Sequence, residues 1–241
     1  MTIRMPAYTD GAHEFFHALL TSALVQAGHL PTIEHLVDYP NLRERKMLKN
    51  GDVDVLWLIH SKERDEQYLP VSVNLTNGLI GQRILLVPPR NLNNFRGVKT
   101  VDDFRELDKA GGFGKDWFDT RVWETNNLRY CEIVNWRLLF NMVADGSRNV
   151  DYFSRGFNEV LRDAKDHPNL AIEPHLMLVY DRDYRFYVSP KAPHIAPIIE
   201  DALTKARKSG LMNEIIKEHW AKNFDILQPE KRTIIKLKSP E

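Results

Sequence analysis

Two histidines and a glutamate near the start of the chain have the spacing of a zinc-protease motif. Residues 13–17 read His-Glu-x-x-His, and on a helix His13 and His17 lie one turn apart. In that geometry both imidazoles can bind one Zn²⁺ ion, while Glu14 acts as the general base of peptide hydrolysis. The motif therefore raises the hypothesis of a metal-dependent hydrolase.

The surrounding sequence favours a packed helix instead. No His-x-x-Gly-x-x-His extension follows the motif, and no third ligand is evident on a neighbouring helix. Apolar residues recur at steps of three and four through residues 13–28, which predicts a helix with one face on a core and a stop at Gly28. We therefore predict no metal, and leave open whether His13 borders a ligand site.

Composition limits the class of protein. The chain has 241 residues, 43% of them hydrophobic, with 33 basic and 33 acidic side chains and a formal net charge of zero. This balance argues against a dedicated nucleic-acid binder. Cys131 is the single cysteine, so no intramolecular disulfide forms, which fits the cytoplasm or a periplasmic protein without bridges. No apolar run reaches the ~20 residues that span a bilayer, and we expect no membrane insertion.

Predicted strands and helices alternate along the chain. Strand, helix, strand, helix and strand follow one another through residues 2–59, as in a parallel sheet with crossover helices. Two long extended segments, near residues 69–88 and 171–190, then suggest crossings between two lobes. We expect lobe 1 to contain residues 1–87 and 185–241 and lobe 2 to contain the inserted residues 88–184.

Within the second lobe and the tail, local composition predicts further elements. These are a capped helix at 100–108, a glycine-rich loop at 111–119, a strand at 120–126, helices at 132–146 and 157–167, a strand at 149–156, and a loosely held tail at 230–241.

A set of spaced residues resembles a known family. Leu48, Gly51 and Asp54 end a polar helix, an apolar strand follows, and Ser61 and Arg64 come next, before Pro70. This order resembles the bacterial extracellular solute-binding proteins of family 3, with the type II periplasmic-binding fold. The pattern recurs in weaker form in residues 139–156, and residues 184–220 resemble the return crossing and closing helices of the family. The resemblance implies an α/β protein of two lobes, with mixed or parallel sheets flanked by helices and two extended hinge crossings.

The resemblance also assigns candidate ligand contacts in the first lobe. Arg64 matches the arginine that forks onto the ligand carboxylate in amino-acid binders, which suits its planar donors. Ser61 keeps a hydroxyl where the family often has threonine. The alternatives are a solvated arginine in a charged run and a helix cap.

Arg155 departs from the family pattern. Amino-acid binders commonly have an aspartate near this point to hold the ligand's amino group. Arginine here, together with Arg64, predicts an anionic or carboxylate-bearing ligand. The alternative is an ion pair with Glu159, four residues further on.

The remaining candidates are matched by position. Asn126 lies where the family has a Gly-Thr pair that holds an anion at a helix start, and Gly78 lies where the first lobe offers backbone groups to ligand. Tyr8, Trp57 and Trp123 lie near predicted strand ends and either stack on a ligand or pack in the core.

These observations predict a non-enzymatic binding protein without catalytic residues or cofactor. The expected mechanism is capture of a small solute between lobes that close on a hinge. The resemblance implies a monomer in the periplasm that serves the membrane component of an ABC transporter, with its signal peptide removed. Two alternatives on the same fold are a ligand-sensing domain and a cyclohexadienyl-dehydratase-like enzyme using Glu124 or Glu132.

Overall fold

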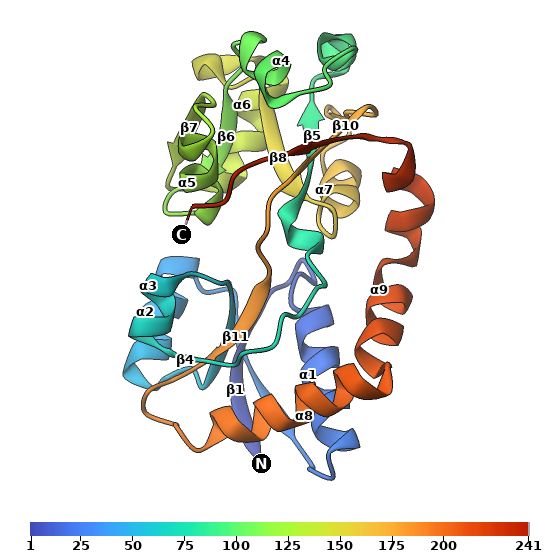
Figure 1. The fold of residues 1–241 in the computed structure, drawn as a ribbon. Coiled ribbons are helices and arrows are strands. Elements are labelled where there is room, and N and C mark those ends of the chain that lie inside the picture. Colours follow the sequence, from blue (N-terminus) through green and yellow to red (C-terminus); the bar gives the residue numbers. More distant parts are fainter. Residues whose placement is uncertain (241) are drawn as a thin grey trace. The chain divides into compact units, whose positions relative to one another are not determined.

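Backbone contacts divide the chain into two units, each built from two sequence segments. The computed structural model describes residues 1–240, and Asn41 by its backbone only. Unit 1 contains residues 1–77 and 183–221, and unit 2 contains residues 78–182 and 222–241 (Figure 1). The chain therefore passes between the units near residues 77 and 182 and again within its last helix.

The strands of unit 1 combine parallel and antiparallel pairs. β1 (Thr2–Ala7) pairs in parallel with β2 (Thr32–Val37). β11 (Tyr184–Val188) lies antiparallel between β3 (Val55–Ile59) and β4 (Leu69–Pro70). A backbone bond of 3.0 Å from Asp54 N–H to the Arg4 carbonyl links the start of β3 to β1.

Helices connect and cover these strands. They are α1 (Glu14–Gln26), α2 (Asn41–Asn50), α3 (Lys62–Gln67), α8 (Ile195–Ser209) and α9 (Leu211–Leu227), whose last residues belong to unit 2. The predicted apolar face of α1 is confirmed, because Phe16, Leu19, Leu20, Ala23 and Leu24 are all buried. α1 packs on α8 (Figure 1). No helix of the described residues is both long and apolar enough to cross a bilayer.

Unit 2 is built on one mixed sheet. Its strand order is β12-β10-β5-β8-β6-β7, with β9 also paired to β5. β5 runs antiparallel to β8 and β10, whereas β6 runs parallel to β7 and β8. The strands are β5 (Gln82–Val87), β6 (Gly111–Gly114), β7 (Tyr130–Ile133), β8 (Tyr152–Gly156), β9 (Ala171–Ile172), β10 (Leu176–Val179) and β12 (Thr233–Lys236).

The helices of unit 2 are short. They are α4 (Val101–Glu106), α5 (Phe118–Thr125), α6 (Leu139–Asp145) and α7 (Val160–Asp166), with 3-10 turns that include η1 (Leu79–Gly81) and η3 (Trp136–Leu138). The predicted capping box of α4 is confirmed, because Thr100 and Asp103 bond each other's backbone N–H groups. The predicted class, α/β with mixed sheets flanked by helices, is confirmed in both units.

Four local predictions in unit 2 differ from the structure. The helix predicted at 132–146 begins in strand β7 and is helical only through η3 and α6. The glycine-rich segment at 111–119 contains strand β6, and the predicted strand at 120–126 is most of helix α5. The tail expected to be loosely held contains β12, which pairs with β10. Tertiary contacts explain α5, because Phe118, Val122 and Trp123 all turn into the core at helical spacing despite their preference for strands.

Close packing explains why β6, with the sequence Gly-Gly-Phe-Gly, is rich in glycine. A Cβ atom on Gly111 would lie 2.7 Å from the ring of Tyr152, and one on Gly112 would lie 2.5 Å from the side chain of Leu139. Side chains of neighbouring elements therefore fill the space that strand residues usually occupy. A glycine-rich stretch that reads locally as a loop becomes a strand because the core closes around it.

The C-terminal segment also changes the division of the chain. The expected division placed residues 185–241 together in lobe 1 and residues 88–184 in lobe 2. In the structure residues 78–87, which were also expected in lobe 1, and residues 222–241 group with unit 2. The side-chain amide of Asn223 donates to the carbonyl of Phe157 (2.7 Å), and β12 extends the sheet of unit 2.

We expect Gly112→Ala to destabilise the protein by about 1–3 kcal/mol, because the added methyl overpacks β6 against Leu139. Urea unfolding followed by circular dichroism measures the loss. Lys115→Ala, at an exposed position just after the same strand, is the matched control and should change stability by less than about 0.5 kcal/mol. Equal stability of Gly112→Ala and the wild type would contradict the packing argument.

Candidate functional site

Two of the predicted aromatic contacts meet in unit 1. Tyr8 directly follows β1, and its ring lies edge-on to Trp57 of β3 with centroids 5.9 Å apart. Trp57 in turn stacks on Phe16 of α1 at 4.6 Å and is only 8% exposed. Trp57 therefore serves first as a core residue, and Tyr8 is the more accessible ring of the pair.

The Tyr8 hydroxyl is held by a buried carboxylate. It donates to Oε2 of Glu44 on α2 at 2.8 Å. Burial raises the pKa of Tyr8, and the nearby negative charge of Glu44 raises it further. Tyr8 is therefore a neutral hydroxyl near neutral pH, and its ring orientation is fixed by α2.

Ser61 and Arg64 lie together at the end of β3. The Ser61 hydroxyl caps α3 by accepting from the backbone N–H of Arg64 (3.3 Å). The Arg64 guanidinium donates from Nη1 to the carbonyl of Ile59. The helix-cap alternative for Ser61 is thus confirmed, whereas Arg64 stays partly exposed beside the end of the strand.

Asp65, which was not among the residues predicted from the sequence, also lies beside the end of β3. Asp65 accepts from the Tyr187 hydroxyl at 2.8 Å and lies 2.9 Å from Nε2 of His60. Burial raises the pKa of Tyr187, and its bond to Asp65 raises it further. Asp65 stood in a charged run that looked solvated, and only the pairing of β3 with β11 brings Tyr187 to it.

A third group in unit 1 consists of histidines. His13, His17 and His35 offer ring nitrogens that all lie within 4.8 Å of one another. Burial lowers the pKa of His17 to about 4, with a smaller contribution from His13. Burial also lowers the pKa of His13. These three imidazoles are the described residues of unit 1 that can hold a metal. His35 was not found from the sequence because β2, not a helix, supplies it.

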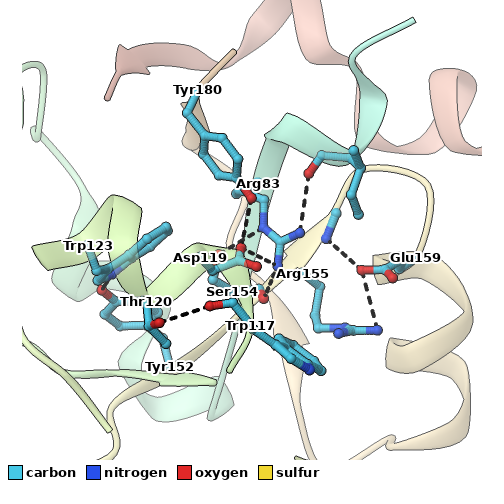
Figure 2. A network of polar contacts seen from close by, with 12 residues as sticks. Arg83, Trp117, Asp119, Thr120, Trp123, Tyr152, Ser154, Arg155, Glu159 and Tyr180 are labelled. Atoms are coloured by element: carbon cyan, nitrogen blue, oxygen red, sulfur yellow. Dashed lines mark hydrogen bonds and ion pairs between the residues drawn. The ribbon is translucent and has the colours of Figure 1, made fainter. Parts of the chain in front are cut away.

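Unit 2 contains a buried polar network around Arg83 (Figure 2). The Arg83 guanidinium lies 3.0 Å from Oδ1 of Asp119, and its Nη2 donates to the Ser154 carbonyl at 2.7 Å. The Tyr180 hydroxyl donates to the same Asp119 oxygen at 2.9 Å. Burial opposes the charge of Arg83, yet the carboxylate of Asp119 leaves its pKa raised.

Arg155 of β8 lies in the same network (Figure 2). Its Nε donates to Oδ2 of Asp163 at 2.5 Å, and its Nη2 lies 3.4 Å from Oε2 of Glu159. The ion-pair alternative is therefore confirmed. Arg155 is only 4% exposed, so in this conformation almost none of its surface is available to a ligand.

The pKa values of the two carboxylates beside Arg155 shift in opposite directions. Burial raises the pKa of Asp163 despite the guanidinium beside it. Burial also acts to raise the pKa of Glu159, but the charges of Arg155 and Arg83 outweigh it and lower that pKa overall. Glu159 further accepts from the backbone N–H of Gly156 at 3.1 Å. The arginine that was predicted to face an anionic solute is thus neutralised by its own chain.

The other predicted contacts of unit 2 have structural partners. Trp123 is fully buried and donates from Nε1 to the Tyr152 hydroxyl at 2.8 Å. Asn126 ends α5 and exchanges side-chain bonds with the backbone of Lys238, at 2.8 and 2.9 Å. Gly78 precedes η1 with a φ of 80°. Unit 2 therefore does not gather these residues into one exposed group.

Solved structures with a similar fold are found by comparison. The structure is similar to an ancestral arginine-binding protein bound to arginine, with a TM-score of 0.62, 16% identity and coverage of 91% of this chain and 97% of that one. The fold is that of the type II periplasmic binding proteins. An ancestral arginine-binding protein bound to glutamine matches at a TM-score of 0.64 with 15% identity, over 91% of this chain and 97% of that one.

A further solved structure with this periplasmic-binding fold is an amino-acid ABC transporter substrate-binding protein from Streptococcus pneumoniae bound to L-arginine. It matches at a TM-score of 0.63 with 14% identity, over 92% of this chain and 95% of that one. No family model and no curated protein matches the chain. The resemblance seen in the sequence is thus confirmed at the level of the fold.

We expect Asp119→Ala to destabilise the protein by about 3–5 kcal/mol, because it leaves the guanidinium of Arg83 buried without its counter-charge. Asp102→Ala is the matched control. It breaks the exposed Asp102–Arg105 pair of α4 and should cost no more than about 1 kcal/mol. Chemical unfolding curves of the two variants measure both losses, and similar losses would show that burial does not govern the network.

Proposed function

We propose that this chain binds a small solute of the amino-acid class and presents it to an ABC transporter. The observation that carries the proposal is the periplasmic-binding fold, which extends over 91–92% of the chain in the matches to proteins bound to arginine or glutamine. Both of those ligands carry an α-carboxylate and an α-amino group. The proposal includes a non-enzymatic role, a periplasmic location and a membrane transporter as partner.

The buried charges of unit 2 argue against an anionic solute. Arg83 and Arg155 supply two positive charges, and they contact the carboxyl groups of Asp119, Glu159 and Asp163. This network has no surplus positive charge to offer an anion. We therefore favour a zwitterionic or cationic amino acid over a dicarboxylate, which revises the expectation drawn from Arg155 in the sequence.

Arg64 is the proposed contact for the solute's carboxylate. Its guanidinium is positioned by the Ile59 carbonyl and remains partly exposed at the end of β3. A planar guanidinium matches a carboxylate with two parallel hydrogen bonds. Tyr8, beside Trp57, is the proposed wall for the apolar part of the solute. Hinge closure and the monomeric state remain predictions.

The structure offers less support for an enzyme. Glu124 and Glu132, the carboxylates considered for a dehydratase, are both exposed. A catalytic acid of that kind is usually prepared by burial or by a nearby like charge. Solute binding without turnover is thus the function that the geometry supports best.

Isothermal titration with the common amino acids and several dicarboxylates tests this proposal. We expect saturable binding of a zwitterionic or cationic amino acid, and a decrease in affinity of about tenfold to a hundredfold in Arg64→Ala, because a charge-assisted contact is lost. Arg96→Ala, an exposed arginine of unit 2, should bind as the wild type does. Binding of dicarboxylates alone, or undiminished binding by Arg64→Ala, would contradict the proposal.

A further inference from the structure

Three histidines converge in unit 1 from two different elements. His13 immediately precedes α1, His17 lies one turn into it, and His35 lies in β2. The ring centroid of His17 lies 4.7 Å from that of His13 and 4.9 Å from that of His35. The pairing of β1 with β2 aligns Met5 with His35 and thereby brings the strand to the start of the helix.

His17 has the arrangement of a metal ligand before any metal binds. Its Nε2 lies 2.9 Å from the carbonyl oxygen of Pro6, and because a carbonyl only accepts, this nitrogen carries the proton. Its Nδ1 therefore has a lone pair, yet that atom is buried without a hydrogen-bond partner, on a side chain that is 8% exposed. Histidines that bind metals typically donate their other N–H to a carbonyl in this way.

His13 and His35 can complete the set. Nδ1 of His13 accepts from the backbone N–H of Tyr8 at 3.0 Å. A metal at Nδ1 replaces that bond, and a metal at Nε2 moves the proton to Nδ1, so in either case the Tyr8 amide loses its acceptor. His35 is exposed, and its ring is able to turn toward the other two.

We propose that His13, His17 and His35 form a binding site for one divalent transition-metal ion of the Zn²⁺ class. Three imidazole nitrogens suit Zn²⁺, Co²⁺, Ni²⁺ and Cu²⁺, whereas Mg²⁺ and Ca²⁺ prefer oxygen ligands. Nitrogens bound to a tetrahedral Zn²⁺ lie about 3.4 Å apart. The cluster, whose nitrogens lie within 4.8 Å of one another, therefore contracts by up to about 1.4 Å, chiefly through His35. The fourth position is open to water or to a small ligand.

This site uses the His-Glu-x-x-His motif without its protease chemistry. The two motif histidines bind the metal, but the third ligand comes from β2 and not from a neighbouring helix. Glu14 is exposed, and its carboxylate lies against Gly11, where an added Cβ would be 3.0 Å from Oε1. The proposal therefore concerns binding alone, and it is independent of the proposed solute and of Arg64.

Titration of the full chain with Co²⁺ and Zn²⁺ tests the site. We expect one equivalent of Co²⁺ to bind with the intense visible absorption of a four-coordinate ion, and Zn²⁺ to displace it. His13→Ala and His35→Ala should each lower the affinity at least tenfold, as removal of one of three ligands requires. In ¹⁵N-labelled protein, the Tyr8 amide should shift on addition of Zn²⁺, because it loses the His13 acceptor.

The controls separate a specific site from adventitious binding. His194→Ala removes an exposed histidine of unit 1 outside the cluster, and Arg64→Ala removes the proposed solute contact; both should bind metal as the wild type does. Because His35 is exposed, His35→Ala is expected to keep the native circular dichroism spectrum. Absence of saturable Co²⁺ and Zn²⁺ binding in the wild type, or equal affinity in His35→Ala and His194→Ala, would overturn the proposal.

Discussion

Unit 2 depends on the pairing of a buried guanidinium with a buried carboxylate. Arg83 is 1% exposed, and an unpaired charge at that depth would be prohibitively unfavourable. Asp119 supplies the counter-charge from the first turn of α5, where the helix dipole also favours an anion. Arg83 also donates to the carbonyls of Ile80 and Ser154 and, from Nε, to the Ser154 hydroxyl. One side chain thereby fixes the relation of β5, η1, α5 and β8.

Arg155 shows how the same constraint alters a functional reading. An arginine at the end of β8 suggested an anionic ligand, because a charge at that point of the fold would normally meet the solute. In the structure Asp163 and Glu159 of the following segment neutralise it, and the rings of Trp117 and Trp136 lie within 5.4 Å of the guanidinium. The charge thus organises unit 2 internally, and the two candidate side-chain contacts with partial exposure, Tyr8 and Arg64, lie in unit 1.

In unit 1, polar groups at β1 connect the candidate solute contact to the histidine cluster. Arg4 and Asp54 form a two-point pair that holds β1 against the start of β3, and Tyr8 and Pro6 follow at the end of β1. Those two residues bond His13 and His17. The end of β1 therefore orients both Tyr8, the proposed solute contact, and the proposed metal ligands His13 and His17. Metal binding at His13 would change the hydrogen bond of the Tyr8 backbone N–H.

The sequence by itself determined the class of fold, the amphipathic face of α1, the cap of α4 and the glycine stop at Gly51, because periodicity and capping are local properties. It did not reveal β6, α5 or β12, whose states follow from what packs on them. Its His-Glu-x-x-His motif contains two of the three clustered histidines, although the sequence predicted no metal, and His35 joins them only through the register of β2 on β1. Only the tertiary structure identified the partners of Arg83 and His17 and showed that Arg155 pairs with its own chain, because burial makes a charge or a lone pair depend on the groups that the fold brings beside it.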